Sequence, residues 1–300
     1  MDGGVFVDWE MTIMKKILIQ LDTDSHPSTF DRVVAVDAGV DELFSYGDIT
    51  PENVTGLVHG AMFTRGPQHL QNTAIFIGGS NVHDGEELLE SVTDTFFGPV
   101  SVSVMMDSNG SNTTAAAAVL SADQHLDFSD TTAAILGGTG PVGQRAAELL
   151  AARGATVKLY SRSQSRAEST CRAIQDKLEQ ATLEPCELKS SQELATELEG
   201  TSLLISAGAA GVEFLTQDDL QSLMSLKVAI DLNAVPPAGL GGIEVMDNAA
   251  EKLDCLCYGA IGVGGLKMKI HKAAIARLFK SNDAVLDADE IYELGKRLEE

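Results

Sequence analysis

The chain has few cysteines, few basic residues and no long apolar run, and each shortage excludes a class of protein. Its four cysteines, at 171, 186, 255 and 257, are too few and too irregularly spaced for a disulfide framework, and no C-x-x-C pair with further ligands indicates zinc. Lys and Arg number 21 against 44 Asp and Glu, and this net charge of −23 would repel nucleic-acid phosphates and anionic membrane surfaces. No charge-free apolar stretch approaches the roughly 20 residues of a transmembrane helix. We therefore expect a protein of the reducing cytoplasm without a nucleic-acid, membrane or metal partner.

The remaining composition is that of an ordinary globular protein. Hydrophobic residues make up 44% of the 300 positions, and Gly and Pro number only 28 and 8, so a fibrous or unfolded chain is excluded. The length is enough for two domains. In the first 16 residues the acidic side chains precede Lys15 and Lys16, which is the wrong charge order for a signal peptide. We expect residues 1–14 to be a poorly ordered extension, translated from an upstream start codon.

Short apolar segments alternate with helical patterns, which is typical of βαβ units and a largely parallel sheet. A polar stretch at 123–130 divides the series in two, so an α/β fold with two domains is predicted. The predicted strands are 15–21, 73–77, 100–106, 131–136, 156–160, 203–206, 227–232 and 256–258. The predicted helices are 84–95, an Ala-rich helix ending near 122, 141–153, 166–180, 266–280 and 287–298.

A glycine-rich motif lies between the strand at 131–136 and the helix at 141–153. In a G-x-G-x-x-G motif the first glycine permits a tight turn, the second lets the backbone approach a pyrophosphate, and the third allows close helix–strand packing. This context favours a Rossmann-like dinucleotide-binding domain over a glycine-rich turn that binds nothing. The motif consists of Gly138, Thr139, Gly140, Pro141, Val142 and Gly143.

The end of the next strand indicates which dinucleotide is bound. An NAD site places Asp or Glu there, about 20 residues after the glycines, to bind the ribose 2′-hydroxyl. This strand instead runs into Ser161, Arg162 and Ser163, with Arg166 one turn later. An arginine between two hydroxyls suits a 2′-phosphate, because its planar fork makes charge-assisted bidentate bonds. We therefore expect NADP, with NAD possible; a solvated surface arginine is the alternative. Further candidate cofactor contacts follow later strands, at Ala207, Gly208 and Asn233.

Polar residues also gather after the first-half strands and near the start of the helix at 266–280. In an open α/β sheet, ligands bind beyond the carboxyl ends of the strands, so a substrate cleft between the domains is expected. Each group also has a structural interpretation as a helix cap, a capping loop or a solvated charge. The scattered histidines have no ligand spacing. The substrate-binding candidates are Asp22, Asp24, Asp107, Asn109, Ser111, Asn112 and Thr113, and the catalytic candidate is Lys267.

A string of motifs from about residue 15 to the end resembles the NAD(P)-dependent methylene-tetrahydromethanopterin dehydrogenases of bacterial one-carbon metabolism. So many matches in order are more specific than any one glycine motif. The first 14 residues and the acidic segment 121–130 depart from the family pattern. The matching segments are Asp22-Thr23-Asp24, Pro27-Ser28, Phe30-Asp31, Tyr46-Gly47, 50–54, 63–66, 73–79, 96–99, 107–114, 138–143 and 262–271.

The resemblance implies an N-terminal pterin-associated α/β domain at 15–126, a Rossmann NADP-binding domain at 127–265 and closing helices at 266–300 that pack back on the first domain. It implies oxidation of the 5,10-methylene form of a tetrahydropterin to the methenyl form, with methylene-tetrahydrofolate accepted by some members. It also implies a cytoplasmic homo-oligomer, a trimer or a multiple of one. Lys267 matches the lysine that the family places in its cleft.

This chemistry requires no general base. A methylene carbon between two nitrogens can lose hydride directly, because the resulting cation is delocalised over both nitrogens. Catalysis then consists of holding the two reacting carbons together and favouring the developing cation, for which Asp22, Asp24 and Asp107 are candidates. We expect Lys267 to orient the pterin or its carbonyl.

Three other functions remain open at this stage. A folate-type methylene dehydrogenase would use the same layout. A shikimate- or glutamyl-reductase-like enzyme would need an acid/base pair in the cleft, which the sequence does not assign. A non-catalytic NADP sensor would bind the dinucleotide without reducing it and would leave the polar loop 107–114 unexplained.

Overall fold

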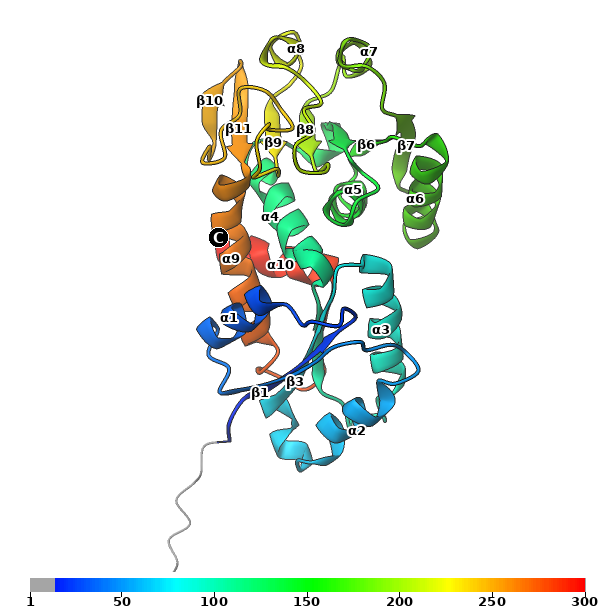
Figure 1. Cartoon of the computed structure of the whole chain (residues 1–300), viewed down its shortest axis with the longest axis vertical. Coiled ribbons are helices and arrows are strands. Elements are labelled where there is room, and N and C mark those ends of the chain that lie inside the picture. The colour runs from blue at the N-terminus through cyan, green and yellow to red at the C-terminus, as the bar shows by residue number, and fades with distance from the viewer. Residues whose placement is uncertain (1–13, 300) are drawn as a thin grey trace, which may run out of the picture.

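Two parallel β-sheets, each covered by helices, form the two halves of the molecule in the computed structural model, which describes residues 14–299 (Figure 1). The extension expected at residues 1–14 lies outside the described residues, apart from Met14. The first half contains β1 Ile17–Asp22, α1 Thr29–Asp37, β2 Glu42–Tyr46, α2 Thr55–Phe63, β3 Thr73–Gly78, α3 Val82–Asp94, β4 Ser103–Met106 and α4 Ser111–Asp123. The second contains β5 Thr132–Leu136, α5 Pro141–Ala152, β6 Thr156–Ser161, α6 Gln164–Lys177, β7 Thr182–Glu187, α7 Ser191–Glu197, β8 Leu203–Ser206, α8 Gln217–Gln221, β9 Val228–Asp231, β10 Ala250–Lys252 and β11 Cys255–Gly259. The chain closes with α9 Ala260–Arg277, β12 Val285–Leu286 and α10 Ala288–Glu299.

The strand orders place two ligand-binding positions. The first sheet runs β12-β4-β3-β1-β2, and all its pairs are parallel. The second runs β10-β11-β9-β8-β5-β6-β7, and only β10 is antiparallel to its neighbour. The chain reverses direction across the sheet between β1 and β3 in the first and between β5 and β8 in the second. Crevices that bind ligands form at such switch points, beyond the carboxyl ends of the strands.

Helix α4 is the central element between the two halves. Eleven of its 13 residues are buried, because α5, α9 and α10 pack around it. The small side chains of residues 115–118, all alanine, allow these helices to approach closely. Gly295 of α10 lies so near that a Cβ there would stand 2.6 Å from Leu120 of α4. The side chains of the Ala-rich segment are thus small and apolar because the helix is buried on all sides.

The domain boundary expected at residue 265 falls inside α9. This helix runs from the second half into the first, as Figure 1 shows, so the closing segment is continuous with the second half. The helix begins at Ala260, six residues before the predicted start, and takes in the glycine-rich run. A glycine is needed within this first turn because the backbone of another segment lies close to it: a Cβ at Gly262 would collide with the carbonyl oxygen of Asp247. Beyond α9, β12 pairs with β4 and returns the chain to the first sheet.

The predicted α/β class with a Rossmann-like second half is confirmed. Every predicted strand has a counterpart within a few residues, while α1, β2, α2, β7, α7, α8, β10 and β12 were not predicted. No helix formed by residues 14–299 is long and apolar enough to cross a membrane.

Candidate functional site

The turn after β5 has the geometry of a pyrophosphate-binding loop. Gly137, which the sequence analysis did not single out, adopts φ = 77° and lets the chain turn sharply. A Cβ at Gly143 would stand 2.6 Å from the carbonyl oxygen of Gly137, and one at Gly138 would stand 2.5 Å from Cγ of Leu159. At Gly140 a Cβ would stand 3.3 Å from the carbonyl oxygen of Gly137 and 3.7 Å from that of Ala207, so this position is less tightly enclosed than the other two. The first and third glycines of the motif therefore serve packing, and the second lies at the N-cap of α5, where phosphate binding requires a close approach to the backbone.

A cavity of about 610 Å³ extends from this turn past the end of β6. Ser161, Arg162, Ser163 and Arg166 line it. Both arginines are exposed, and the ion pairs among residues 14–299 include neither guanidinium. They are thus free to meet an anion. The other lining residues are Asn109, Thr114, Gly137, Thr139, Gly140, Pro141, Val142, Leu188, Ala207, Gly208, Ala209, Val212, Phe214 and Leu232.

A second cavity, of about 350 Å³, lies at the switch point of the first sheet. Three carboxylates and one cation are on its wall, together with exposed aromatic surface from Phe30. Asn109 and Thr114 line this cavity as well as the dinucleotide cavity, so the two adjoin. Its residues are Asp22, Asp24, His26, Ser28, Phe30, Asp31, Gly79, Ser80, Asn109, Gly110, Thr114 and Lys267.

Lys267 is the cation of the second cavity. Its Nζ lies 4.2 Å from the ring centroid of Phe30 and 3.4 Å from Nδ1 of His271, one helical turn later on α9. Burial lowers the pKa of Lys267, and the charges of Asp107 and Asp31 oppose that shift. The carboxylates therefore favour the charged form of the amine.

Two residues that the sequence analysis did not select complete this surrounding. Burial, together with the charge of Asp107, raises the pKa of Asp31 to about 6. Burial lowers the pKa of His271 to about 4, so this side chain is neutral near pH 7. Its Nε2 stands 3.9 Å from Oδ1 of Asp31, and its ring stacks on Phe76 at 5.9 Å between centroids. Both residues stand in segments of the family-like motifs, which was the only signal for them in the sequence.

Several predicted site residues lie behind the cavity walls. Asp107 is fully buried and accepts from the backbone N–H of Thr113 at 3.0 Å and from its hydroxyl at 2.6 Å. Ser111 and Asn112 are also fully buried. The amide of Asn233 donates to the carbonyl of Pro237 and accepts from the N–H of Val235, within its own loop. These side chains hold the backbone of the site, whereas Asn109 lines both cavities.

Of the acidic candidates, Asp22 and Asp24 reach the cavity in different ways. Asp22 is 1% exposed, and its carboxylate accepts from the N–H groups of Asp24 and Ser28. It therefore shapes the turn after β1, and burial raises its pKa. Asp24 is exposed and accepts from the hydroxyl of Ser80 at 2.9 Å, so it links the ends of β1 and β3 across the mouth of the cavity.

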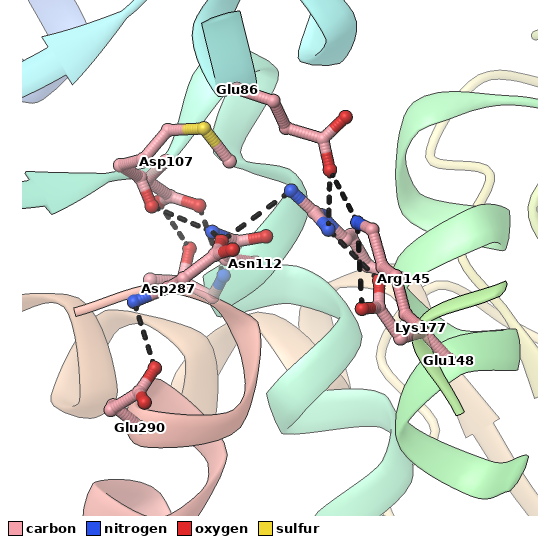
Figure 2. A network of polar contacts seen from close by, with 10 residues as sticks. Glu86, Asp107, Asn112, Arg145, Glu148, Lys177, Asp287 and Glu290 are labelled. Carbon is pink, nitrogen blue, oxygen red and sulfur yellow. Dashed lines mark hydrogen bonds and ion pairs between the residues drawn. The ribbon is translucent and has the colours of Figure 1, made fainter. Parts of the chain in front are cut away.

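A network of charged side chains joins the elements behind the two cavities (Figure 2). Arg145 of α5 pairs with Glu148 at 2.9 Å, with Glu86 of α3 at 3.1 Å and with Asp287 at 3.4 Å. Lys177 of α6 pairs with Glu86 at 2.9 Å. No local sequence pattern indicates this cluster, because its members are far apart in the chain.

The fold, with its Rossmann-like second half and two adjoining cavities, is one found in NAD(P)-dependent oxidoreductases. The same fold occurs in shikimate 5-dehydrogenase from Listeria monocytogenes, at a TM-score of 0.54 and 14% identity over 93% of this chain and 96% of that one. It also occurs in 5-ketofructose reductase of a Gluconobacter species, at a TM-score of 0.52 and 18% identity over 95% and 99% of the two chains.

Sequence comparisons identify the family. Residues 29–109 match the family model "Methylene-tetrahydromethanopterin dehydrogenase, N-terminal". Two proteins of Methylorubrum extorquens are similar over nearly the whole chain. One, the bifunctional protein MdtA, is 43% identical over 95% of this chain and 99% of the relative. The other, an NAD(P)-dependent methylenetetrahydromethanopterin dehydrogenase, is 30% identical over 94% and 98%. The chain therefore belongs to the methylene-tetrahydromethanopterin dehydrogenase family, as the resemblance predicted.

Proposed function

We propose that this enzyme oxidises 5,10-methylene-tetrahydromethanopterin to the 5,10-methenyl form by direct hydride transfer to NADP. The observation that carries this proposal is the junction of the two cavities at Asn109 and Thr114. A reduced pterin in the smaller cavity and a nicotinamide in the larger one would meet there. A hydride donor and acceptor held in contact supply most of what such a reaction needs.

The residues of the larger cavity fit NADP. Gly140 lines this cavity at the N-cap of α5, and a pyrophosphate would lie there, in front of the helix N-terminus. Arg162 would take the 2′-phosphate with Ser161, Ser163 and Arg166, since the cavity wall has no carboxylate at that position. When bound, the nicotinamide ring accepts the hydride. Asn233 would shape the loop beside this cavity, because its side chain bonds within that loop.

Lys267 would orient the pterin. Its ammonium stands on the wall of the smaller cavity, with Asp31 and Asp107 near enough to favour its charge. A charged amine donates hydrogen bonds, and the pterin carbonyl is the acceptor that suits it. The carboxylates at 22, 24 and 31 make the cavity negative, so they favour the cation that hydride loss creates. Ser111, Asn112 and Thr113 support this site from behind.

Three finer points belong to the same proposal. We infer that the enzyme is cytoplasmic and homo-oligomeric, a trimer or a multiple of one, on the family resemblance. We infer that methylene-tetrahydrofolate is at most a second substrate. A non-catalytic NADP sensor is disfavoured because it would leave the cavity around Lys267 without a role.

The test is a comparison of four mixtures at 340 nm. The purified protein is given methylene-tetrahydromethanopterin or methylene-tetrahydrofolate, each with NADP and with NAD. We expect rapid reduction with the methanopterin substrate and NADP. Equal rates with NAD and NADP would contradict the assignment of Arg162 to the 2′-phosphate. No reduction in any mixture, with NADP still bound, would favour the sensor.

A further inference from the structure

Arg145 is an arginine almost without solvent contact. Only 2% of its surface is exposed, and it projects from α5, the helix whose N-terminus faces the dinucleotide cavity. It is paired with carboxylates from three elements: Glu86 of α3, Glu148 of its own helix and Asp287 at the start of α10. Ionic networks of this kind are expensive to bury and are not needed to fill a core. Its location between the two halves therefore calls for a role other than packing.

The network continues from Arg145 to the turn after β4. Oδ1 of Asp287 also accepts from the amide of Asn112, at 2.8 Å. The same amide donates to the carbonyl of Met106 at 2.7 Å. Next along the chain, Asp107 closes the turn by accepting from Thr113. Figure 2 shows this unbroken path from the guanidinium to the backbone at residues 106–107.

That turn carries Asn109, and the first turn of α4 after it carries Thr114; these are the residues shared by both cavities. Asn109 has φ = 55° and Gly110 has φ = 60°, the left-handed region that these two residue types adopt readily, so the chain turns sharply between β4 and α4. Asn109 and Thr114 line the junction of the two cavities, where the reacting carbons would meet. The contacts of Arg145 thus connect the helix of the dinucleotide turn to the wall of the reaction site.

We propose that Arg145 is a positioning residue for hydride transfer, which fixes the turn at 107–110 to the dinucleotide-binding helix α5 through Asp287 and Asn112. Glu86 and Lys177 extend the same network to α3 and α6, so the two halves are held at one spacing. This inference rests on the proposed function, since it assigns Arg145 a role in that reaction. A role in stability alone is the competing explanation, because removing one partner of a buried network is also destabilising.

The experiment uses the full chain with Arg145→Gln, Arg145→Lys and Asp287→Asn. Arg172→Gln is the matched control, because Arg172 makes an exposed ion pair with Glu168 on α6. Rates are measured with methylene-tetrahydromethanopterin and with the substrate dideuterated at the methylene carbon. We expect Arg145→Gln to lower kcat at least tenfold and to enlarge the deuterium isotope effect, while KM for NADP changes less than threefold. Arg145→Lys should recover part of kcat, and the control should match wild type.

A second readout does not depend on turnover. Hydrogen exchange of a peptide that spans residues 103–120 is followed with and without NADP. We expect NADP to slow exchange in the wild type, and to do so much less in Arg145→Gln. Wild-type kcat and isotope effect in a variant with a lowered melting temperature would overturn the proposal. If Arg145→Gln does not fold, Asp287→Asn decides by the same criteria. If the wild type shows no turnover, the proposed function fails, and the exchange data still report whether Arg145 holds the turn.

Discussion

Nζ of Lys267 lies 3.4 Å from Nδ1 of His271, one turn apart on α9. A charged amine has no acceptor, so Nδ1 of a neutral histidine must accept this bond and its proton resides on Nε2. That Nε2 is buried without a hydrogen-bond partner among residues 14–299 and points toward Asp31 at 3.9 Å. Lys267 is therefore held as a donor by a neutral base on its own helix and by carboxylates from the neighbouring elements.

We expect Lys267→Ala to lower kcat at least a hundredfold while the Kd of NADP stays within a factor of three, because the side chain lies on the wall of the smaller cavity alone. Lys267→Arg should retain more activity, since a charged donor remains. Steady-state kinetics and a direct NADP titration test both claims. Loss of NADP binding with unchanged turnover at saturation would contradict the assigned role.

The raised pKa of Asp31 predicts a pH dependence. Asp31 is charged above about pH 6, and its negative charge favours both the ammonium of Lys267 and the cation formed by hydride loss. Turnover should therefore rise between pH 5 and 7 and then level off. Asp31→Asn should be slower and should lack this rise, whereas Asp24→Asn, an exposed carboxylate, should keep it. His271 stays neutral across this range because its pKa is about 4. An unchanged profile in Asp31→Asn would assign the rise to another group.

Cofactor choice is predicted to depend on Arg162. A charge-assisted bond from this side chain to the 2′-phosphate contributes about 1.5–3 kcal/mol. Arg162→Ala should therefore raise the Kd of NADP roughly ten- to a hundredfold and leave the Kd of NAD little changed. Arg172→Ala, on α6 but outside the cavity, is the control. Equal losses for both dinucleotides would show that Arg162 does not contact the 2′-phosphate.

Local patterns sufficed to predict the elements whose sequence is strongly biased. The strand at 73–77 is apolar apart from Thr73 and lies fully buried in β3, and the glycine motif is followed by α5 as expected. Helix α2 was missed because its apolar residues show no helical periodicity. The start of α9 was misplaced because a run of glycines ordinarily ends a helix, whereas here the N-cap Gly259 and Gly262 of the first turn allow the close backbone of residues 244–248.

The site could be predicted only where its residues are contiguous in the chain. The larger cavity is lined largely by the segments 137–142, 161–166 and 207–209, and most of these residues, though not Gly137 or Ala209, were among the cofactor-binding candidates. The surroundings of Lys267 come from α1, the turn after β4 and α9, so their meeting depends on tertiary packing. Asp107 is an example: the sequence indicated a polar residue at the end of a strand, but not that its carboxylate would be bonded to Thr113 behind the cavity wall.

The two glycines at 140 and 143 allow phosphate binding and packing to be separated. At Gly143 a Cβ would stand 2.6 Å from a carbonyl oxygen and 2.8 Å from Cα of Gly138, and neither backbone atom can yield. Gly143→Ala should therefore lower the free energy of unfolding by about 1–3 kcal/mol and also weaken the binding of NADP. At Gly140 the contact with the carbonyl oxygen of Gly137 would be 3.3 Å, which a shift of a few tenths of an ångström relieves, so Gly140→Ala should lower the free energy of unfolding less than Gly143→Ala does. It should still raise the Kd of both NADP and NAD at least tenfold, because the methyl group would occupy the place of the pyrophosphate. Denaturant unfolding and dinucleotide titrations of both variants separate the effect on stability from the effect on binding. Normal dinucleotide binding by Gly140→Ala would contradict a pyrophosphate site at the α5 N-terminus.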